Sequence, residues 1–144
     1  MDRKIAAALV SALALGVVSC GSAGPKLTRE QLISKVEAAC QEGGQTTQRE
    51  MRGSSSTPVQ YGSAITAGQR VIVARLRGLN PPAAAKRDFI AFQAGMQQRL
   101  QVYEQVLAAL RGGGQPSAAL QQHNLTLFRQ LDALAKREGF VGCI

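Results

Sequence analysis

Apolar residues recur three and four positions apart through most of the chain after residue 27, which is the spacing of one face of an α-helix. Four segments carry this pattern, at residues 28–51, 57–77, 81–111 and 117–138. The residues expected on the buried faces are, in chain order, Ile33, Val36, Cys40, Thr47, Met51; Tyr61, Ile65, Gly68, Ile72, Leu76; Phe89, Phe92, Met96, Leu100, Tyr103, Val106, Leu107, Leu110; and Leu120, Leu127, Leu131, Leu134. The pattern therefore predicts an all-α protein.

Local signals place the ends of these helices. Thr28 and Thr57 each precede a glutamine by three residues, which is the spacing of a capping box, and Ser117 is suited to cap the fourth helix. Asn80 followed by Pro81 predicts a capped start for the third helix. Glycines follow the second, third and fourth helices, and Phe140 and Val141 after Gly139 are expected to fold back onto the bundle. The weakest segment is Gly43-Gly44 inside the first helix, because glycine costs about 1 kcal/mol relative to alanine there.

The connections between the four helices are short, so neighbouring helices should run antiparallel. This predicts an up-down-up-down four-helix bundle spanning residues 28–144. With the helices counted at 1.5 Å per residue, the end of the fourth helix falls near the level of Cys40 in the first. The topology therefore brings Cys40 and Cys143 within reach of one another.

The first twenty residues begin with Met-Asp-Arg-Lys and are apolar from Ile5 to Val18. A charged start, an apolar stretch too short to span a membrane comfortably and small residues at its end are typical of a secretory signal peptide. Val17-Val18-Ser19-Cys20 resembles the lipobox of bacterial lipoproteins, in which the cysteine is acylated and becomes the first residue. We expect a signal peptide at 1–19, a lipidated tether at 20–27 and a location on the extracytoplasmic face of the cell membrane. The alternative is an ordinary signal peptide with a chance cysteine. Gly21 offers no acidic sorting signal, so the sequence does not choose between membranes in a two-membrane host.

The cysteine count agrees with export. If Cys20 carries lipid, Cys40 and Cys143 remain as a pair. In an oxidising compartment such a pair is expected to form a disulfide, which would stabilise the fold by up to ~5 kcal/mol in the chain-entropy model. The alternative is two buried free thiols.

Basic residues dominate the charge. The whole chain has a net charge of +8, and removal of residues 1–19 leaves 15 Lys and Arg against 8 Asp and Glu. The predicted topology gathers eight of these at the end of the bundle that carries the tether, against Glu30, Asp88 and Glu138, for a local balance of +5. They are Lys26, Arg29, Arg75, Arg77, Lys86, Arg87, Lys136 and Arg137. We expect this end to face anionic lipid headgroups, and export makes nucleic acid an unlikely partner.

Residues that carry chemistry are few. The chain has no Glu-x-x-His pair for a di-iron centre, and His123 is its only histidine, which excludes a multi-histidine zinc site. The acidic residues are scattered, and residues 112–114 lack the Lys-Ser/Thr of a phosphate loop. We therefore expect no catalytic residue, no metal and no cofactor.

Three short segments resemble a group of small lipoproteins of high-GC Gram-positive bacteria. They are Ala38-Ala39-Cys40, Gly78-Leu79-Asn80-Pro81-Pro82 and Gly139-Phe140-Val141-Gly142-Cys143. The resemblance implies a helical-bundle lipoprotein and adds a location but no activity.

Two hypotheses about the function follow from the sequence. One is a non-enzymatic envelope lipoprotein that docks on the membrane or on an envelope protein partner. The other is a module that binds a small apolar ligand where Gly68, Gly95 and the phenylalanines leave space.

Overall fold

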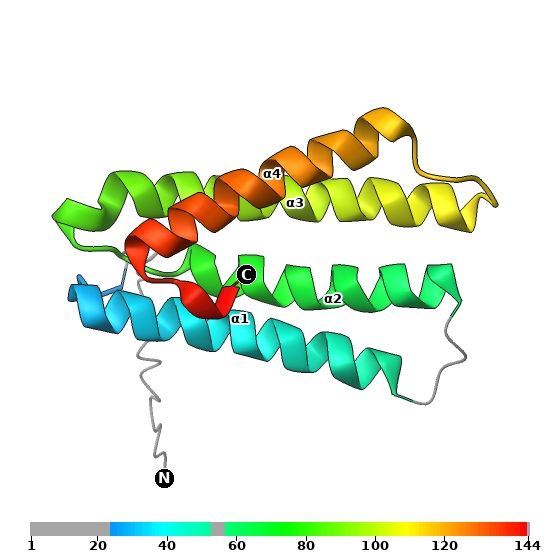
Figure 1. The fold of residues 1–144 in the computed structure, drawn as a ribbon. Helices are drawn as coiled ribbons and strands as arrows, with labels where there is room; N and C mark the ends of the chain where they lie inside the picture. The colour runs from blue at the N-terminus through cyan, green and yellow to red at the C-terminus, as the bar shows by residue number, and fades with distance from the viewer. Residues whose placement is uncertain (1–23, 53–56, 144) are drawn as a thin grey trace, which may run out of the picture.

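The computed structural model of this chain describes residues 24–52 and 57–143. They form four α-helices, α1 (Arg29–Met51), α2 (Pro58–Arg77), α3 (Lys86–Arg111) and α4 (Ala118–Glu138), and two short 3-10 helices, η1 (Ala83–Ala85) and η2 (Val141–Cys143). No strand occurs among them. Successive helices run in opposite directions, so the start of α1, the α2–α3 connection and the end of α4 lie at one end of the bundle, which we call the tether end (Figure 1). The predicted all-α, up-down-up-down bundle is confirmed.

Side-chain caps fix three of the helix starts. Thr28 and Thr57 each accept a hydrogen bond from the backbone N–H three residues on, and the glutamine side chain at that position accepts one from the threonine N–H. The predicted capping boxes are therefore both present. Ser117 accepts a bond from the N–H of Leu120 at 3.2 Å, as expected. Each of these bonds satisfies a donor that a helix start otherwise leaves without a partner.

The third helix begins later than predicted. Pro81 and Pro82 are not helical, η1 follows them, and α3 starts at Lys86. The physical reason is the proline pair, because a proline disfavours the helical conformation of the residue before it, which here is Pro81. Asn80 consequently caps nothing. Its side-chain amide donates to the carbonyl of Gly24 at 2.8 Å, and its own carbonyl accepts from the N–H of Leu27 at 3.0 Å, so the chain joins the bundle from Gly24 onward.

Glycines let α1 and α2 approach closely. The helix α1 continues through Gly43 and Gly44 without a break. A Cβ at Gly43 would lie 2.7 Å from the carbonyl oxygen of Gly68, and one at Gly68 would meet Gly43 in turn. The side chain of Thr47 donates to the Gly43 carbonyl at 3.1 Å. Two small residues facing each other thus replace the side-chain layer that normally separates packed helices.

The core is centred nearer the tether end. Its largest fully buried side chains are Phe89, Phe92, Phe140, Leu32, Leu76, Met96, Val36 and Thr66. The predicted face of α1 was one residue out of phase at its start, since Leu32 rather than Ile33 is fully buried, and Met51 is 40% exposed. The predicted face of α2 was also partly wrong. Tyr61 is 52% exposed, whereas Gln69 is buried and donates to the carbonyl of Met96 at 3.1 Å.

The chain after α4 turns back onto the core. Gly139 has φ of +83°, the left-handed conformation that ends a helix, and Phe140 follows it into the core. The Phe140 ring lies edge-on to Phe89 at 6.5 Å between centroids and tilted against Phe92 at 5.1 Å. The expectation for Phe140 is confirmed, whereas that for Val141 is wrong, since its side chain is 64% exposed. The segment η2 then crosses from α4 to α1.

Candidate functional site

The disulfide predicted between Cys40 and Cys143 is present. The two Cα atoms are 5.1 Å apart, although 103 positions separate the residues in sequence. Through it η2 ties the end of α4 to the middle of α1, and Gly142 passes beside Glu37. Cys20, the predicted lipid attachment site, and the predicted signal peptide lie outside the described residues. Within the described part of the chain, no helix is long and apolar enough to cross a membrane.

The predicted basic surface is more divided than the sequence suggested. Arg75 donates two hydrogen bonds of 2.8 Å to the carboxylate of Glu42, which lies in the middle of α1. Arg77 donates to the side chain of Gln97, well inside α3, at 2.7 Å. Both arginines therefore engage the flanks of the bundle. The cause is the long α2–α3 connection, which carries the chain onward after α2 ends and so moves the start of α3 beyond Arg77.

Ion pairs also reduce the charge at the tether end. Asp88 binds Arg87 at 2.9 Å and Arg137 at 2.9 Å, and Lys136 binds Asp132 one turn before it at 2.8 Å. Arg29 lies 3.7 Å from the buried carboxylate of Glu138. With Glu42 and Asp132 included, the eight basic residues face five acidic ones, a balance of +3 instead of +5. Lys26 and Lys86 are exposed and make no ion pair to another described residue.

Two carboxylates show the electrostatic effect of these pairs. Hydrogen bonds from Arg75 hold the pKa of Glu42 below its ordinary value of 4.5, although desolvation opposes the shift. The pKa of Asp88 is likewise lowered from 3.8, first by its hydrogen bond to Arg87 and further by the charge of Arg137. The pKa values of Arg75 and Arg87 are raised by the same contacts. These groups are structural ion pairs at the surface.

His123 is exposed on α4, as expected for a surface residue. No group of three His, Cys, Asp or Glu residues comes together in the described ranges as a metal site.

Gly68 and Gly95, where the sequence predicted space, each make one close helix contact and also border a hollow. Gly68 packs on Gly43, and a Cβ at Gly95 would lie 2.8 Å from the side chain of Leu131. Phe89, Phe92 and Phe140 are each at most 1% exposed. Within the described ranges, the phenylalanines therefore border no hollow, whereas one hollow lies beside each of the two glycines.

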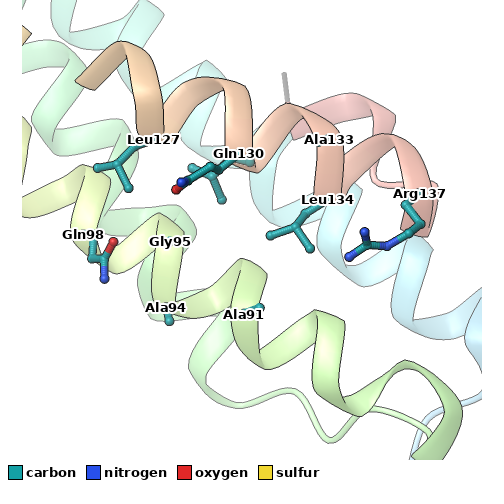
Figure 2. A pocket seen from close by; sticks show the side chains of 10 residues that line it. Ala91, Ala94, Gly95, Gln98, Leu127, Gln130, Ala133, Leu134 and Arg137 are labelled. Atoms are coloured by element: carbon teal, nitrogen blue, oxygen red, sulfur yellow. The ribbon is translucent and has the colours of Figure 1, made fainter. Parts of the chain in front are cut away.

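One hollow lies on the outside of the α3–α4 pair (Figure 2). It has a volume of about 430 Å³, and Ala91, Ala94 and Gly95 form its α3 wall. Figure 2 shows Leu127 and Leu134 of α4 directed toward that wall, with Arg137 at one end. The hollow is a shallow groove produced by small residues, and the polar side chains at its rim are exposed.

A second hollow, also open to solvent, lies between the α1–α2 pair and the α3–α4 pair. It consists of two adjoining cavities that share Tyr61, Ile65 and Tyr103 as lining residues, and we call it the inner cleft. The cavity nearer the disulfide, which we call the lower cavity, has a volume of about 380 Å³. The disulfide and Gly142 form part of its wall, and Thr47, Gln69, Ile72 and Arg99 also line it. The cavity nearer the start of α2, which we call the upper cavity, has a volume of about 360 Å³. It is lined mainly by apolar atoms, and its lining residues include Val106, Leu110 and Asn124.

The inner cleft exists because α1 and α4 are joined only near the tether end. There η2 and the disulfide connect them, and with distance from η2 the two helices diverge in the view of Figure 1. In the diverging half, exposed apolar side chains border the bundle, including Tyr61, Leu125 and Phe128. Both cavity volumes fall in the range of small-molecule sites, about 300–1,000 Å³.

Two polar groups stand out in the inner cleft. The guanidinium of Arg99 lies over the rings of Tyr103 and Phe128, at 5.2 and 5.4 Å from their centroids, and its Nε donates to the Tyr103 hydroxyl at 2.7 Å. Asn124 Oδ1 is buried and accepts no hydrogen bond from the described residues. Our sequence analysis missed both residues. The signal was available, because Arg99 lies between Met96 and Tyr103 on an apolar face and Asn124 lies between Leu120 and Leu127 on another.

We compared the chain with known proteins. No family model, curated protein or solved structure matches this chain.

Proposed function

We propose that this protein is a non-enzymatic lipoprotein of the bacterial cell envelope, anchored on the extracytoplasmic face through Cys20, with its helical bundle as an interaction domain. The observation that carries the proposal is the Cys40–Cys143 disulfide. Structural disulfides persist in oxidising compartments, which supports export. Because the disulfide uses two of three cysteines, Cys20 is left for another role, and it stands at the end of a lipobox-like segment.

The tether end is suited to face the membrane. The described chain enters the bundle there at Gly24, only four residues after Cys20. Lys26 and Lys86 are unpaired within the described structure, and Arg87 is 92% exposed despite its bond to Asp88. Basic side chains near an anionic surface contribute about 1 kcal/mol each. In this arrangement the acyl chains anchor the protein and the free lysines orient it.

The mass of the mature protein tests the anchor. Protein purified from the envelope of its host should begin at Cys20 and carry the mass of a diacylglyceryl group, and Cys20→Ala should abolish that mass. The matched control is Ser22→Ala, which leaves the lipobox-like segment intact. An unmodified N-terminus at any other residue would remove the anchor from this proposal.

Vesicle binding tests the orientation. The chain from Gly21 to Ile144 contains every core residue and lacks the acyl group, so it isolates the contribution of charge. It should bind vesicles that contain anionic lipid, and salt should weaken the binding. Lys26→Gln with Lys86→Gln should cost about 2 kcal/mol, or roughly 25-fold in affinity. Arg49→Gln with Arg52→Gln removes the same charge at the opposite end and should leave the affinity nearly unchanged. Equal losses in the two double variants would contradict the orientation.

The inner cleft supports a second candidate, the binding of a small apolar ligand. The observation in its favour is the upper cavity, whose walls are mainly apolar and include the residue Asn124. A mostly apolar hollow with a few polar groups is typical of ligand sites. This function does not compete with anchoring, because none of the predicted membrane-facing basic residues lines either cavity.

A further inference from the structure

We propose that the inner cleft binds a single-chain anionic amphiphile, a molecule with one alkyl chain and one carboxylate-like head. The head lies at Arg99 in the lower cavity, and the chain lies in the upper cavity. The inference rests on the ligand-binding candidate above and names the class of its ligand, whereas it is independent of the anchor at Cys20.

The charge of the cleft selects the head. Arg99 is the only charged residue among the described residues that line either cavity, and no described carboxylate pairs with it. Its Nε is occupied by Tyr103, and no described group accepts a hydrogen bond from its two terminal nitrogens. A guanidinium stacked between two rings is held in one place and presents its remaining donors to a planar, two-oxygen anion.

The walls of the cleft select the tail. The lower cavity adds the polar side chains of Thr47 and Gln69 to Arg99, whereas the upper one is bounded chiefly by Tyr61, Val106 and Leu110. Polarity therefore falls along the cleft from the disulfide toward the start of α2.

The size of the cleft favours this occupant over a peptide helix. A helix with its side chains is about 10–12 Å across, and it needs a long open groove. Each cavity here instead has the volume of a small-molecule site, and the two share Tyr61, Ile65 and Tyr103 as lining residues. A single alkyl chain passes between Tyr61 and Tyr103 more readily than a helix does.

Calorimetric titration with three amphiphiles of equal chain length tests the proposal. The probes are dodecanoate, dodecanol and dodecyltrimethylammonium, each below the concentration at which it forms micelles, added to the oxidised chain from Gly21 to Ile144. We expect dodecanoate to bind at least tenfold more tightly than dodecyltrimethylammonium, with dodecanol between them. Arg99→Gln should weaken dodecanoate about tenfold and remove the preference, since hydrogen bonds to charged groups are among the stronger ones. Arg129→Gln, an exposed arginine outside the cleft, is the matched control and should change nothing.

Filling the cleft tests the location. Val106→Trp should abolish the binding of all three probes, and Leu125→Trp, on an exposed surface of α4, should not. Leu110→Trp, at the same cavity, replaces Val106→Trp if the latter lowers the melting temperature. Equal affinity for the three heads with blockage by Val106→Trp would overturn the anionic assignment and leave the ligand-binding candidate standing. Dodecanoate binding that Val106→Trp and Leu110→Trp leave unchanged, or no binding of any probe, would overturn both.

Discussion

The two halves of this bundle differ in what fills the space between the helix pairs. Near the tether end, Phe89, Phe92 and Phe140 are at most 1% exposed, and the tail after α4 fastens that helix to α1 through the disulfide. In the other half no large aromatic side chain is fully buried, Tyr61 is 52% exposed, and the upper cavity of the inner cleft lies between the helix pairs. We call these the closed half and the open half.

The difference follows partly from the apolar pattern and partly from the tail after α4. Residues 41–50 of α1 contain no large apolar side chain, whereas the other three helices carry apolar residues along their whole length. The closed half is densely packed because Phe140 enters the core and η2 links α4 to α1. In the open half, the described residues provide no such link between α1 and α4. Stability should therefore reside in the closed half and ligand binding in the open half.

The largest expected effect comes from emptying the closed half. Phe140→Ala removes a fully buried ring that contacts two others, and it should cost about 3–5 kcal/mol of unfolding free energy. Val141→Ala at the next position and Tyr61→Ala in the open half remove exposed side chains and should cost about 0.5 kcal/mol or less. Denaturant unfolding measures all three. Comparable losses at Tyr61 and Phe140 would erase the distinction between the halves.

The second effect is the loss of the disulfide. Cys143→Ser should cost about 2–5 kcal/mol, because the bond closes a loop that spans most of the chain. Reducing agent should lower the melting temperature of the wild type but leave that of Cys40→Ser with Cys143→Ser unchanged. A wild-type melting temperature indifferent to reduction would mean that η2 does not secure the closed half.

The third effect compares two glycines of the α1–α2 pair. Gly68→Ala forces a methyl group against Gly43 and should destabilise by about 1–3 kcal/mol. Gly44→Ala places the same group in open space on α1 and should stabilise by up to about 1 kcal/mol through helix propensity. We therefore expect the melting temperature to fall for Gly68→Ala and to rise for Gly44→Ala, each relative to the wild type. A shift in the same direction for both would contradict the close approach of the two helices.

The smallest effect is the acid dependence of a surface ion pair. Arg75 lowers the pKa of Glu42, so the Glu42 carboxyl group binds a proton less tightly in the folded state than in the unfolded state. The stability from this pair is therefore present above the ordinary pKa of 4.5 and is lost as pH falls through the lowered folded-state value. Glu42→Gln should lower the melting temperature at pH 7 and make little difference at pH 3. Gln45→Glu, which adds an exposed carboxylate on the next turn, is a control that should not reproduce this pattern.

The sequence predicted the fold well where local chemistry decides it. The capping boxes at Thr28 and Thr57 and the glycine stop at Gly139 depend on residues three or fewer positions apart, and all three are present. The start of α3 was missed because the effect of Pro82 on Pro81 outweighed the capping signal of Asn80. The buried faces of α1 and α2 shifted because the Gly43–Gly68 contact sets how these helices rotate against each other, and spacing alone does not reveal such a contact.

The candidate sites were predictable to different degrees. The disulfide followed from the cysteine count, since the two cysteines left after Cys20 is assigned to lipid are expected to pair in a chain that is expected to be exported. The pairing of Arg75 with Glu42 joins residues 33 positions apart and depends on the rotation of both helices, so it was not foreseen. The sequence predicted space beside Gly68, which lines the lower cavity, but not the extent of the inner cleft, which depends on the divergence of α1 and α4. The only indication of that extent in the sequence was the presence of two polar residues, Arg99 and Asn124, on apolar helix faces.

Amide hydrogen exchange with and without dodecanoate tests the division between the halves most directly. Without ligand, backbone amides beside Leu32, Phe92 and Leu131 should exchange only on global unfolding, and those of residues 58–65 and 118–127 should exchange faster. Dodecanoate should slow the second group selectively. Uniform protection along all four helices, or ligand-induced protection confined to the closed half, would contradict the account.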